Sequence, residues 1–121
     1  MNNSKRNKKT KDNRKNYRIP EELLSKMPGE SYSEKISHIT LKFSKKKREE
    51  LVSSNTLYEI YGRKEKKHTS IRMIDDEVAE IERLHEMYGI SCTKVVIILA
   101  TASLYSENEL KKLIKQENKK G

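Results

Sequence analysis

Residues 68–105 read HTSIRMIDDEVAEIERLHEMYGISCTKVVIILATASLY, and the spacing of their apolar side chains changes from that of a strand to that of a helix. The first six residues alternate between two faces, as side chains do along an extended chain. The face predicted to point into the protein carries Thr69, Ile71 and Met73. The opposite face carries His68, Ser70 and Arg72. This alternation predicts one short amphipathic strand.

Two helices are predicted after this strand. Apolar residues recur at spacings of three and four over residues 78–88, and two aspartates precede them, where the positive end of a helix dipole favours carboxylates. Gly89 can adopt the positive φ that ends many helices. Ser91 is a suitable N-cap for a second helix, which would carry the apolar residues 95–104.

This strand and its two helices are not expected to form a stable domain by themselves. A lone strand leaves its ladder hydrogen bonds unmade, and two short helices cannot bury a segment as apolar as VVIILATA at residues 95–102. We therefore expect the unit to pair with a second copy of the same motif.

The order of strand, helix, Gly-Ile-Ser turn and apolar helix resembles the ribbon-helix-helix superfamily of Arc-like and Met-repressor-like DNA-binding proteins. The residues that carry the resemblance are Ser70-Ile-Arg-Met-Ile-Asp-Asp-Glu77 and Leu84-His-Glu-Met-Tyr-Gly-Ile-Ser91. One departure is Ile74, since many relatives have a proline where the first helix starts. The resemblance implies a mainly α fold with short β, built as an intertwined dimer in which two antiparallel strands form a ribbon.

By this resemblance, the polar face of the ribbon reads base edges in the major groove of DNA. The implied readers are His68, Ser70 and Arg72, and the arginine suits guanine because a guanidinium can bond its O6 and N7 together. Phosphate contacts are implied beside the strand and at the free amides that start the second helix. The residues concerned are Lys67, Ser91, Cys92, Thr93 and Lys94. The alternatives are a plain surface cation for the arginine and a passive packing residue for the cysteine.

Residues 16–52 repeat the strand and helix pattern in shortened form and are a candidate second motif. The outward positions of its strand would hold Asn16 and Arg18, which are further candidate base readers. The inward positions would hold Tyr17 and Ile19. The alternative is a helical element that packs on the main dimer without forming a true motif.

The helices of this candidate motif are expected to differ in length from those of the C-terminal one. Pro20, which suits a first helical turn, and the expected cap Ser33 are 13 positions apart, whereas Ile74 and Ser91 are 17 positions apart. The first helix is therefore predicted to be a stub. Ser33 would cap a second helix that continues through residue 48, and it is a candidate phosphate contact as well.

Three further segments complete the predicted organisation. Residues 1–15 form a basic arm, expected to stay disordered until it meets an anion, with a solubilising tail as the alternative. Residues 53–66 join the motif of residues 16–52 to the motif of residues 67–105, and within this linker TLYE fits a helix or a strand. The two motifs of one chain could fold on each other, or each could pair with another chain.

Residues 106–121 open with a Ser-x-x-Glu capping box and predict a C-terminal helix and tail, either a brace over the core or a contact between dimers.

Composition narrows the class of function. A net charge of +9 and a pI near 9.6 predict a polyanionic partner. The longest apolar run is too short to span a membrane, and the basic N-terminus lacks the apolar segment of a secretory signal. A single cysteine excludes an internal disulfide and fits the cytoplasm. Because no phosphate loop, nucleophile elbow or metal-ligand spacing is present, we expect neither an enzyme nor a metal or other cofactor.

These patterns favour a sequence-specific binder of double-stranded DNA that acts as a homodimer, or as a tetramer on repeated sites. By analogy with the superfamily, its role would be that of an accessory factor at a plasmid transfer origin, in the relaxosome of conjugation, or that of a transcriptional repressor. The alternative is an antitoxin-like or relaxase-interacting protein whose N-terminal half binds a protein partner. A third hypothesis is a nonspecific RNA or nucleoid binder, which would show steep salt dependence and no sequence preference.

Overall fold

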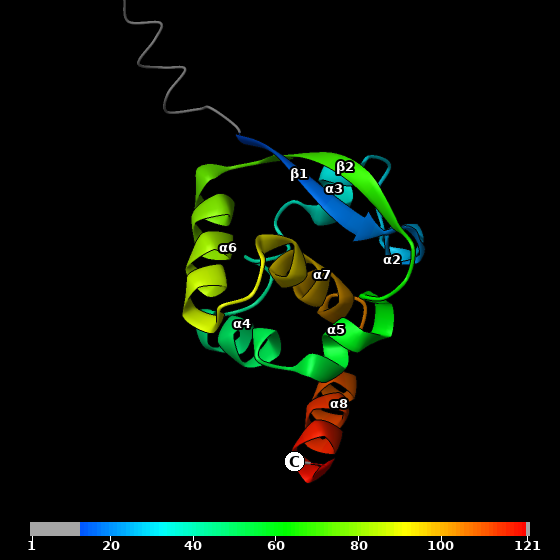
Figure 1. Cartoon of the computed structure of the whole chain (residues 1–121), viewed down its shortest axis with the longest axis vertical. Coiled ribbons are helices and arrows are strands. Elements are labelled where there is room, and N and C mark those ends of the chain that lie inside the picture. Colours follow the sequence, from blue (N-terminus) through cyan, green and yellow to red (C-terminus); the bar gives the residue numbers. More distant parts are fainter. Residues whose placement is uncertain (1–12, 121) are drawn as a thin grey trace, which may run out of the picture.

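The computed structural model describes residues 13–120, with side-chain positions for residues 14–115. This part of the chain is mostly helical, with seven helices and one two-stranded antiparallel sheet (Figure 1). The elements in order are β1 (Asn13–Pro20), α2 (Glu21–Lys26), α3 (Tyr32–Ile36), α4 (Lys45–Val52), α5 (Asn55–Tyr61), β2 (Lys66–Met73), α6 (Asp75–Tyr88), α7 (Cys92–Ala102) and α8 (Glu107–Lys120). The predicted class, mainly α with short β, is confirmed.

The two strands pair with each other within one chain. In the antiparallel ladder Asn16 lies opposite Ser70, with Arg14 opposite Arg72 on one side and Arg18 opposite His68 on the other. The sequence left open whether this strand would pair within a chain or between chains. Because β1 satisfies the ladder of β2, a second copy of the chain is not needed to complete the ribbon.

The predicted alternation of both strands is confirmed. The inward positions are buried, and they are Tyr17, Ile19, Thr69, Ile71 and Met73. The even-numbered residues between them are exposed. Both hydroxyls among the inward side chains have partners, since Thr69 donates to the Tyr17 carbonyl oxygen at 2.8 Å and Tyr17 donates to the Met73 sulfur at 4.0 Å. One face of the ribbon therefore closes the core, and the other is free.

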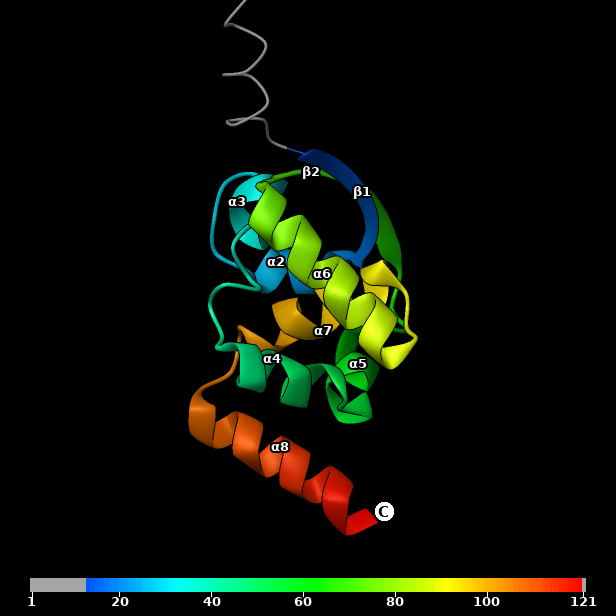
Figure 2. The same ribbon diagram turned by 90° about the vertical axis from the view of Figure 1, so that its left-hand side faces the viewer.

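The C-terminal half follows the predicted pattern closely. Helix α6 ends at Gly89, which has φ +65°, and the Gly89 N–H donates to the His85 carbonyl. The Ser91 hydroxyl then accepts from the Lys94 N–H and caps α7. Residues 95–102 of α7 are all buried. Helix α7 lies at the centre of the molecule in both views, under the ribbon and among α4, α5 and α6 (Figures 1 and 2).

The N-terminal half departs from its prediction after α2. This helix has six residues, so the expected stub is confirmed. The next helix is capped by Ser31 rather than Ser33, because Ser31 and Glu34 form a reciprocal capping box. Helix α3 ends after five residues, and the chain then turns through His38, which has φ +71°. The predicted continuous helix from Ser33 through residue 48 is therefore wrong.

A buried carboxylate holds the non-helical segment between α3 and α4. Glu77, in the first turn of α6, has no exposed surface. Its Oε2 accepts from the Thr40 hydroxyl at 2.6 Å and from the Leu41 N–H at 3.3 Å. A carboxylate removed from water needs such donors, and a helical turn would commit the Leu41 N–H elsewhere. The chain resumes a helix only at α4, where the Ser44 hydroxyl accepts from the Lys47 N–H.

Two predicted boundaries also need correction. Half of the expected linker, residues 53–66, is helix α5, whose Leu57 and Tyr61 are buried against the core, so the TLYE segment is helical. Residues 13–15 of the expected arm belong to β1. The rest of that arm, residues 1–12, lies outside the described residues.

Ion pairs join α4 to α6 beside this core. Arg83 Nη1 lies 2.8 Å from Glu49 and its Nη2 lies 2.7 Å from Glu80, which in turn lies 2.8 Å from Arg48 Nε. The hydrogen bond from Arg83 holds the pKa of Glu80 below its ordinary value, despite the opposing effect of burial, and Arg48 lowers it further. These four residues tie a helix of the N-terminal half to one of the C-terminal half.

Helix α8 packs at the end of the molecule opposite the ribbon (Figure 2). Ser106 and Glu109 form the predicted capping box, with the Ser106 N–H donating to Glu109 at 2.8 Å and the Glu109 N–H donating to Ser106 at 3.2 Å. Leu110 is buried and α8 contacts α5. This packing supports the brace interpretation of the C-terminal helix.

Candidate nucleic-acid interface

Six polar side chains form what we call the outer ribbon face. They are Arg14, Asn16 and Arg18 of β1 and His68, Ser70 and Arg72 of β2, and all six are exposed. Directly opposite residues of an antiparallel pair stand about 5 Å apart, so the three cross-strand pairs make one continuous patch. The helices gather on the inner side of the ribbon (Figures 1 and 2).

The outer ribbon face is basic and contains no carboxylate. Arg14 Nη1 makes one long hydrogen bond to the Ser70 hydroxyl, at 3.4 Å. Within the described part of the chain, none of its three arginines forms an ion pair. Arginines that lack a carboxylate partner keep their donors available for an external acceptor.

Arg14 is a site residue that the sequence analysis missed. It was assigned to the disordered arm, although it shares the outward parity of Asn16 and Arg18. Extending the alternation by one more step toward the N-terminus would have found it. The ladder places it directly opposite Arg72, so the two arginines occupy one end of the face.

Ser33 supports the ribbon from its edge instead of capping a helix. Its hydroxyl accepts from the backbone N–H of Arg72 at 2.9 Å, and the residue is half-buried. Helix α3, which carries Ser33, lies against β2. The bond satisfies a backbone donor on the outer edge of β2 and helps to fix the strand that presents Arg72.

The start of α7 flanks β1. Ser91 is exposed, while Cys92, Thr93 and Lys94 are half-buried. Burial raises the pKa of the Cys92 thiol, assisted by Glu82 and opposed by the nearby Lys15. A thiol with a raised pKa stays protonated at neutral pH, which fits a passive packing role. Lys15 is a second cation that the sequence analysis missed at this flank.

Two of the predicted phosphate-binding lysines lie over aromatic rings. Lys94 Nζ is 4.7 Å from the centre of the Tyr58 ring, and Lys67 Nζ is 5.7 Å from the centre of the Tyr32 ring. Interaction with the Tyr32 hydroxyl raises the pKa of Lys67. Lys67 of β2 therefore stays charged, while Lys94 lies against α5.

The two halves of the chain are related in register at the ribbon. Ile74, which follows β2, lies 54 positions after Pro20, which ends β1, and Ser70 lies the same 54 positions after Asn16. Because Asn16 and Ser70 are also opposite each other, an approximate twofold axis that exchanges the two strands passes between these two residues. The two strands therefore pair in the register that two identical copies of one strand would adopt.

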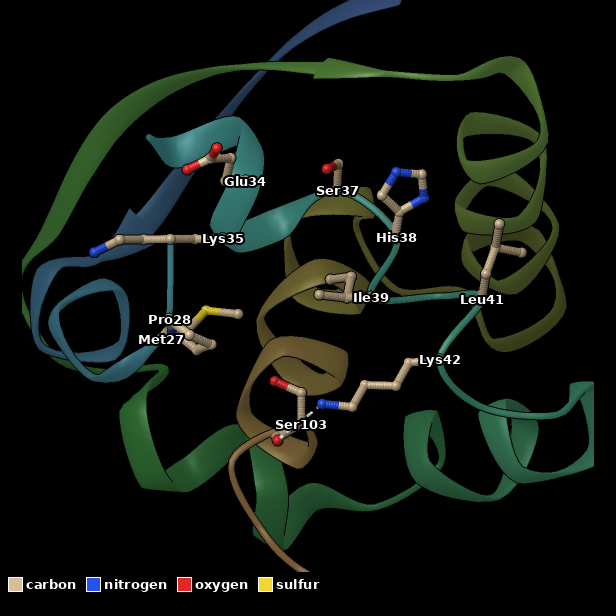
Figure 3. Close-up of a pocket in the computed structure, with 10 residues that line it drawn as sticks. All are labelled: Met27, Pro28, Glu34, Lys35, Ser37, His38, Ile39, Leu41, Lys42 and Ser103. Carbon is tan, nitrogen blue, oxygen red and sulfur yellow. Dashed lines mark hydrogen bonds between the residues drawn. The ribbon is translucent and has the colours of Figure 1, made fainter. Parts of the chain in front are cut away.

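A surface hollow lies away from the outer ribbon face and is formed mostly by residues 27–42. Its volume is about 440 Å³, and its lining is Met27, Pro28, Glu34, Lys35, Ser37, His38, Ile39, Leu41, Lys42 and Ser103 (Figure 3). Lys42 Nζ donates to the Ser103 carbonyl at 3.4 Å across it. The described residues contain no group of three His, Cys, Asp or Glu side chains arranged to hold a metal ion.

Comparison of the chain with models of protein families, with curated proteins and with solved structures finds no match. Among residues 13–120, no helix combines the length and the apolar character that a membrane span requires. The observations that bear on function are therefore the outer ribbon face, its flanking cations and the hollow beside the N-terminal half.

Proposed function

We propose that this protein is a sequence-specific binder of double-stranded DNA, of the ribbon-helix-helix type, in which a single chain supplies both strands of the ribbon. The observation that carries the proposal is the outer ribbon face, with six exposed polar side chains in register, three of them arginines, and no carboxylate. Among the described residues, no carboxylate pairs with the arginines of this face, so their donors are available to an external acceptor.

The shape and chemistry of this face fit the major groove. That groove is about 12 Å wide and accepts a two-stranded ribbon, whose strands lie about 4.8 Å apart. Arginine bonds guanine through O6 and N7, asparagine bonds adenine through N6 and N7, and serine accepts or donates. The major groove of duplex RNA is too narrow for side chains to read, which favours DNA over RNA.

Cations beside the ribbon would supply the part of the affinity that does not depend on sequence. Lys15 and Lys94 lie at the α7 flank and Lys67 lies at the α3 flank. The net charge of +9 acts in the same direction. The amide N–H groups at the start of α7 would donate to a phosphate oxygen once the ribbon is seated.

The biological role that follows is repression of transcription or marking of a plasmid transfer origin in the cytoplasm, without catalysis and without a cofactor. The resemblance of residues 68–105 to ribbon-helix-helix repressors supports this step. A homodimer is not needed to build the reading surface, so further copies of the chain would serve to fill repeated sites.

The test measures binding of the full chain to duplexes from its own promoter and from a plasmid transfer origin. Arg72→Ala should weaken binding to the preferred duplex by about 1–3 kcal/mol and remove the preference over unrelated DNA. Lys111→Ala removes the same charge from α8, at the opposite end of the molecule, and should change little. Equal weakening of Arg72→Ala on preferred and unrelated duplexes would show that this arginine contacts phosphate.

A second candidate function, the binding of a protein partner, is favoured by the hollow in Figure 3. Its lining comes mostly from the N-terminal half and includes Leu41, which is 48% exposed, together with Lys35 and Lys42. A partner with acidic residues around an apolar anchor, such as a relaxase or a toxin encoded beside this chain, would complement it.

The partner hypothesis predicts a selective effect of charge in this hollow. Leu41→Asp should abolish co-purification with the neighbouring protein and leave DNA binding intact. Met87→Asp is the matched control, since Met87 is 53% exposed on α6 and outside the hollow. Retention of the partner by both variants would remove this candidate.

A further inference from the structure

The twofold axis of the ribbon relates residues that differ in chemistry. The same 54-position offset that pairs Asn16 with Ser70 makes Arg14 equivalent to His68, and Arg18 equivalent to Arg72. Only the last of these three equivalent positions holds the same residue type in both halves. The outer ribbon face therefore has a symmetric backbone with an asymmetric set of side chains.

The two ends of the face differ as a result. One end carries Arg14 opposite Arg72, and the other carries Arg18 opposite His68. A ribbon made from two copies of one strand must present identical ends, because the axis exchanges them. Here one end offers two guanidinium forks, and the other offers one fork and an imidazole.

Resting on the proposed function, we infer that the outer ribbon face reads a non-palindromic duplex and does so in one orientation. The end with Arg14 and Arg72 selects two guanines, since each fork bonds one guanine through O6 and N7. The end with Arg18 and His68 selects one guanine and a second purine, whose N7 accepts a single bond from the imidazole. Asn16 beside Ser70 makes the centre unequal as well.

The length of the face sets the size of the site. Four residues separate the Arg14–Arg72 pair from the Arg18–His68 pair, which is about 13 Å along a strand. Base pairs of DNA are spaced by about 3.4 Å, so the two ends contact positions about four base pairs apart. Asymmetric reading is confined to this short core.

The helices and charged groups beside the two edges of the ribbon also differ from each other. Helix α7 has 11 residues, and its Lys94 lies near its start together with Lys15 of β1, whereas α3 has five residues and carries Glu34 in its first turn. Glu34 accepts from the backbone N–H groups of Glu30 at 2.7 Å and Ser31 at 3.3 Å. A carboxylate there repels a phosphate, so DNA is held more tightly at the α7 flank, which reinforces a single orientation.

The test is selection of bound duplexes from a random pool by the full chain, followed by sequencing of the enriched core. The wild type should enrich a non-palindromic core. Arg14→Ala and Arg72→Ala should relax base preference at one end of it, and Arg18→Ala and His68→Ala at the other, each by about fivefold to a hundredfold. Thermal unfolding of each variant controls for folding.

A symmetrising variant makes the test sharper. The double substitution His68→Arg with Asn16→Ser gives both strands the same three outward residue types. Its enriched core should become a palindrome. A palindromic core for the wild type, or relaxation of the same end by all four alanine variants, would overturn the inference while leaving DNA binding in place. No enrichment of any duplex by the wild type would instead overturn the proposed function and this inference with it.

Discussion

The two halves of the chain contribute matching strands but very different helices. After β2, the C-terminal half builds three long helices, the first two joined by a glycine turn, whereas the N-terminal half divides its chain after β1 among four short helices. Both strands nevertheless alternate in the same way and meet about one axis. The comparison indicates that the reading surface requires matched strands, while the helical support behind each strand can differ as long as it closes the same core.

The strongest test of this comparison asks whether the halves share one core. Leu57 of α5 and Leu84 of α6 have no exposed surface, so Leu57→Ala and Leu84→Ala should each cost about 2–5 kcal/mol of unfolding free energy. Urea denaturation followed by circular dichroism should show one transition for each variant. Leu41→Ala, at a residue that is 48% exposed, should cost less than about 0.5 kcal/mol. Two separate transitions would mean that the halves fold independently.

A smaller effect is expected at the contact that breaks the helix of the N-terminal half. Thr40→Val removes the hydroxyl that donates to the buried Glu77 carboxylate, and it should cost about 1–3 kcal/mol because that oxygen loses its shortest hydrogen bond. Thr40→Ser keeps the donor and should recover most of the loss in the same denaturation experiment. A loss for Thr40→Ser as large as that for Thr40→Val would contradict the claim that the hydroxyl bond to Glu77 dominates the cost.

The turns between the first two helices of each half should respond unequally to alanine. Gly29 has φ +121°, and a Cβ there would lie 3.0 Å from the Cβ of Glu34, whereas Gly89 has φ +65° and open space around it. Gly89→Ala should cost about 1 kcal/mol from backbone strain, and Gly29→Ala should cost more, up to about 3 kcal/mol. Thermal unfolding measures both, and the reverse order would contradict the described turn of the N-terminal half.

The smallest predicted effect concerns the ion pairs between α4 and α6. The folded-state pKa of Glu80 lies below its ordinary value of 4.5, so its contribution to stability is present above pH 4.5 and is lost as the pH falls through the lowered pKa. The wild type should therefore lose its advantage over Glu80→Gln in acid, by on the order of 1 kcal/mol. Glu86→Gln, at an exposed residue of the same helix, is the control. A Glu80→Gln deficit that persists unchanged into acid would count against the network.

Local signals explain what the sequence predicted correctly. Strand parity, the glycine at position 89 and the serine cap at position 91 each depend on a few neighbouring residues, and all three are confirmed. The short α2 could be predicted because it follows from counting positions between two junctions. Such features need no knowledge of the rest of the fold.

Long-range contacts explain what could not be predicted. The break after α3 depends on Glu77, which a sequence pattern identifies only as one of three acidic residues in a first helical turn. The pairing of β1 with β2 in one chain follows from how the two halves share a core, and no local pattern separates it from pairing between chains. Arg14 was missed because the start of β1 lies within a run of basic residues that has no apolar positions to mark it.

The most direct test of the central claim is the number of chains in a complex with one protected DNA core. Native mass spectrometry of the full chain on the shortest footprinted duplex measures this number. If a single chain provides both strands of the reading ribbon, one chain bound to one core is the predicted complex. A core that is occupied only by two chains, with no one-chain complex at any protein concentration, would contradict the account.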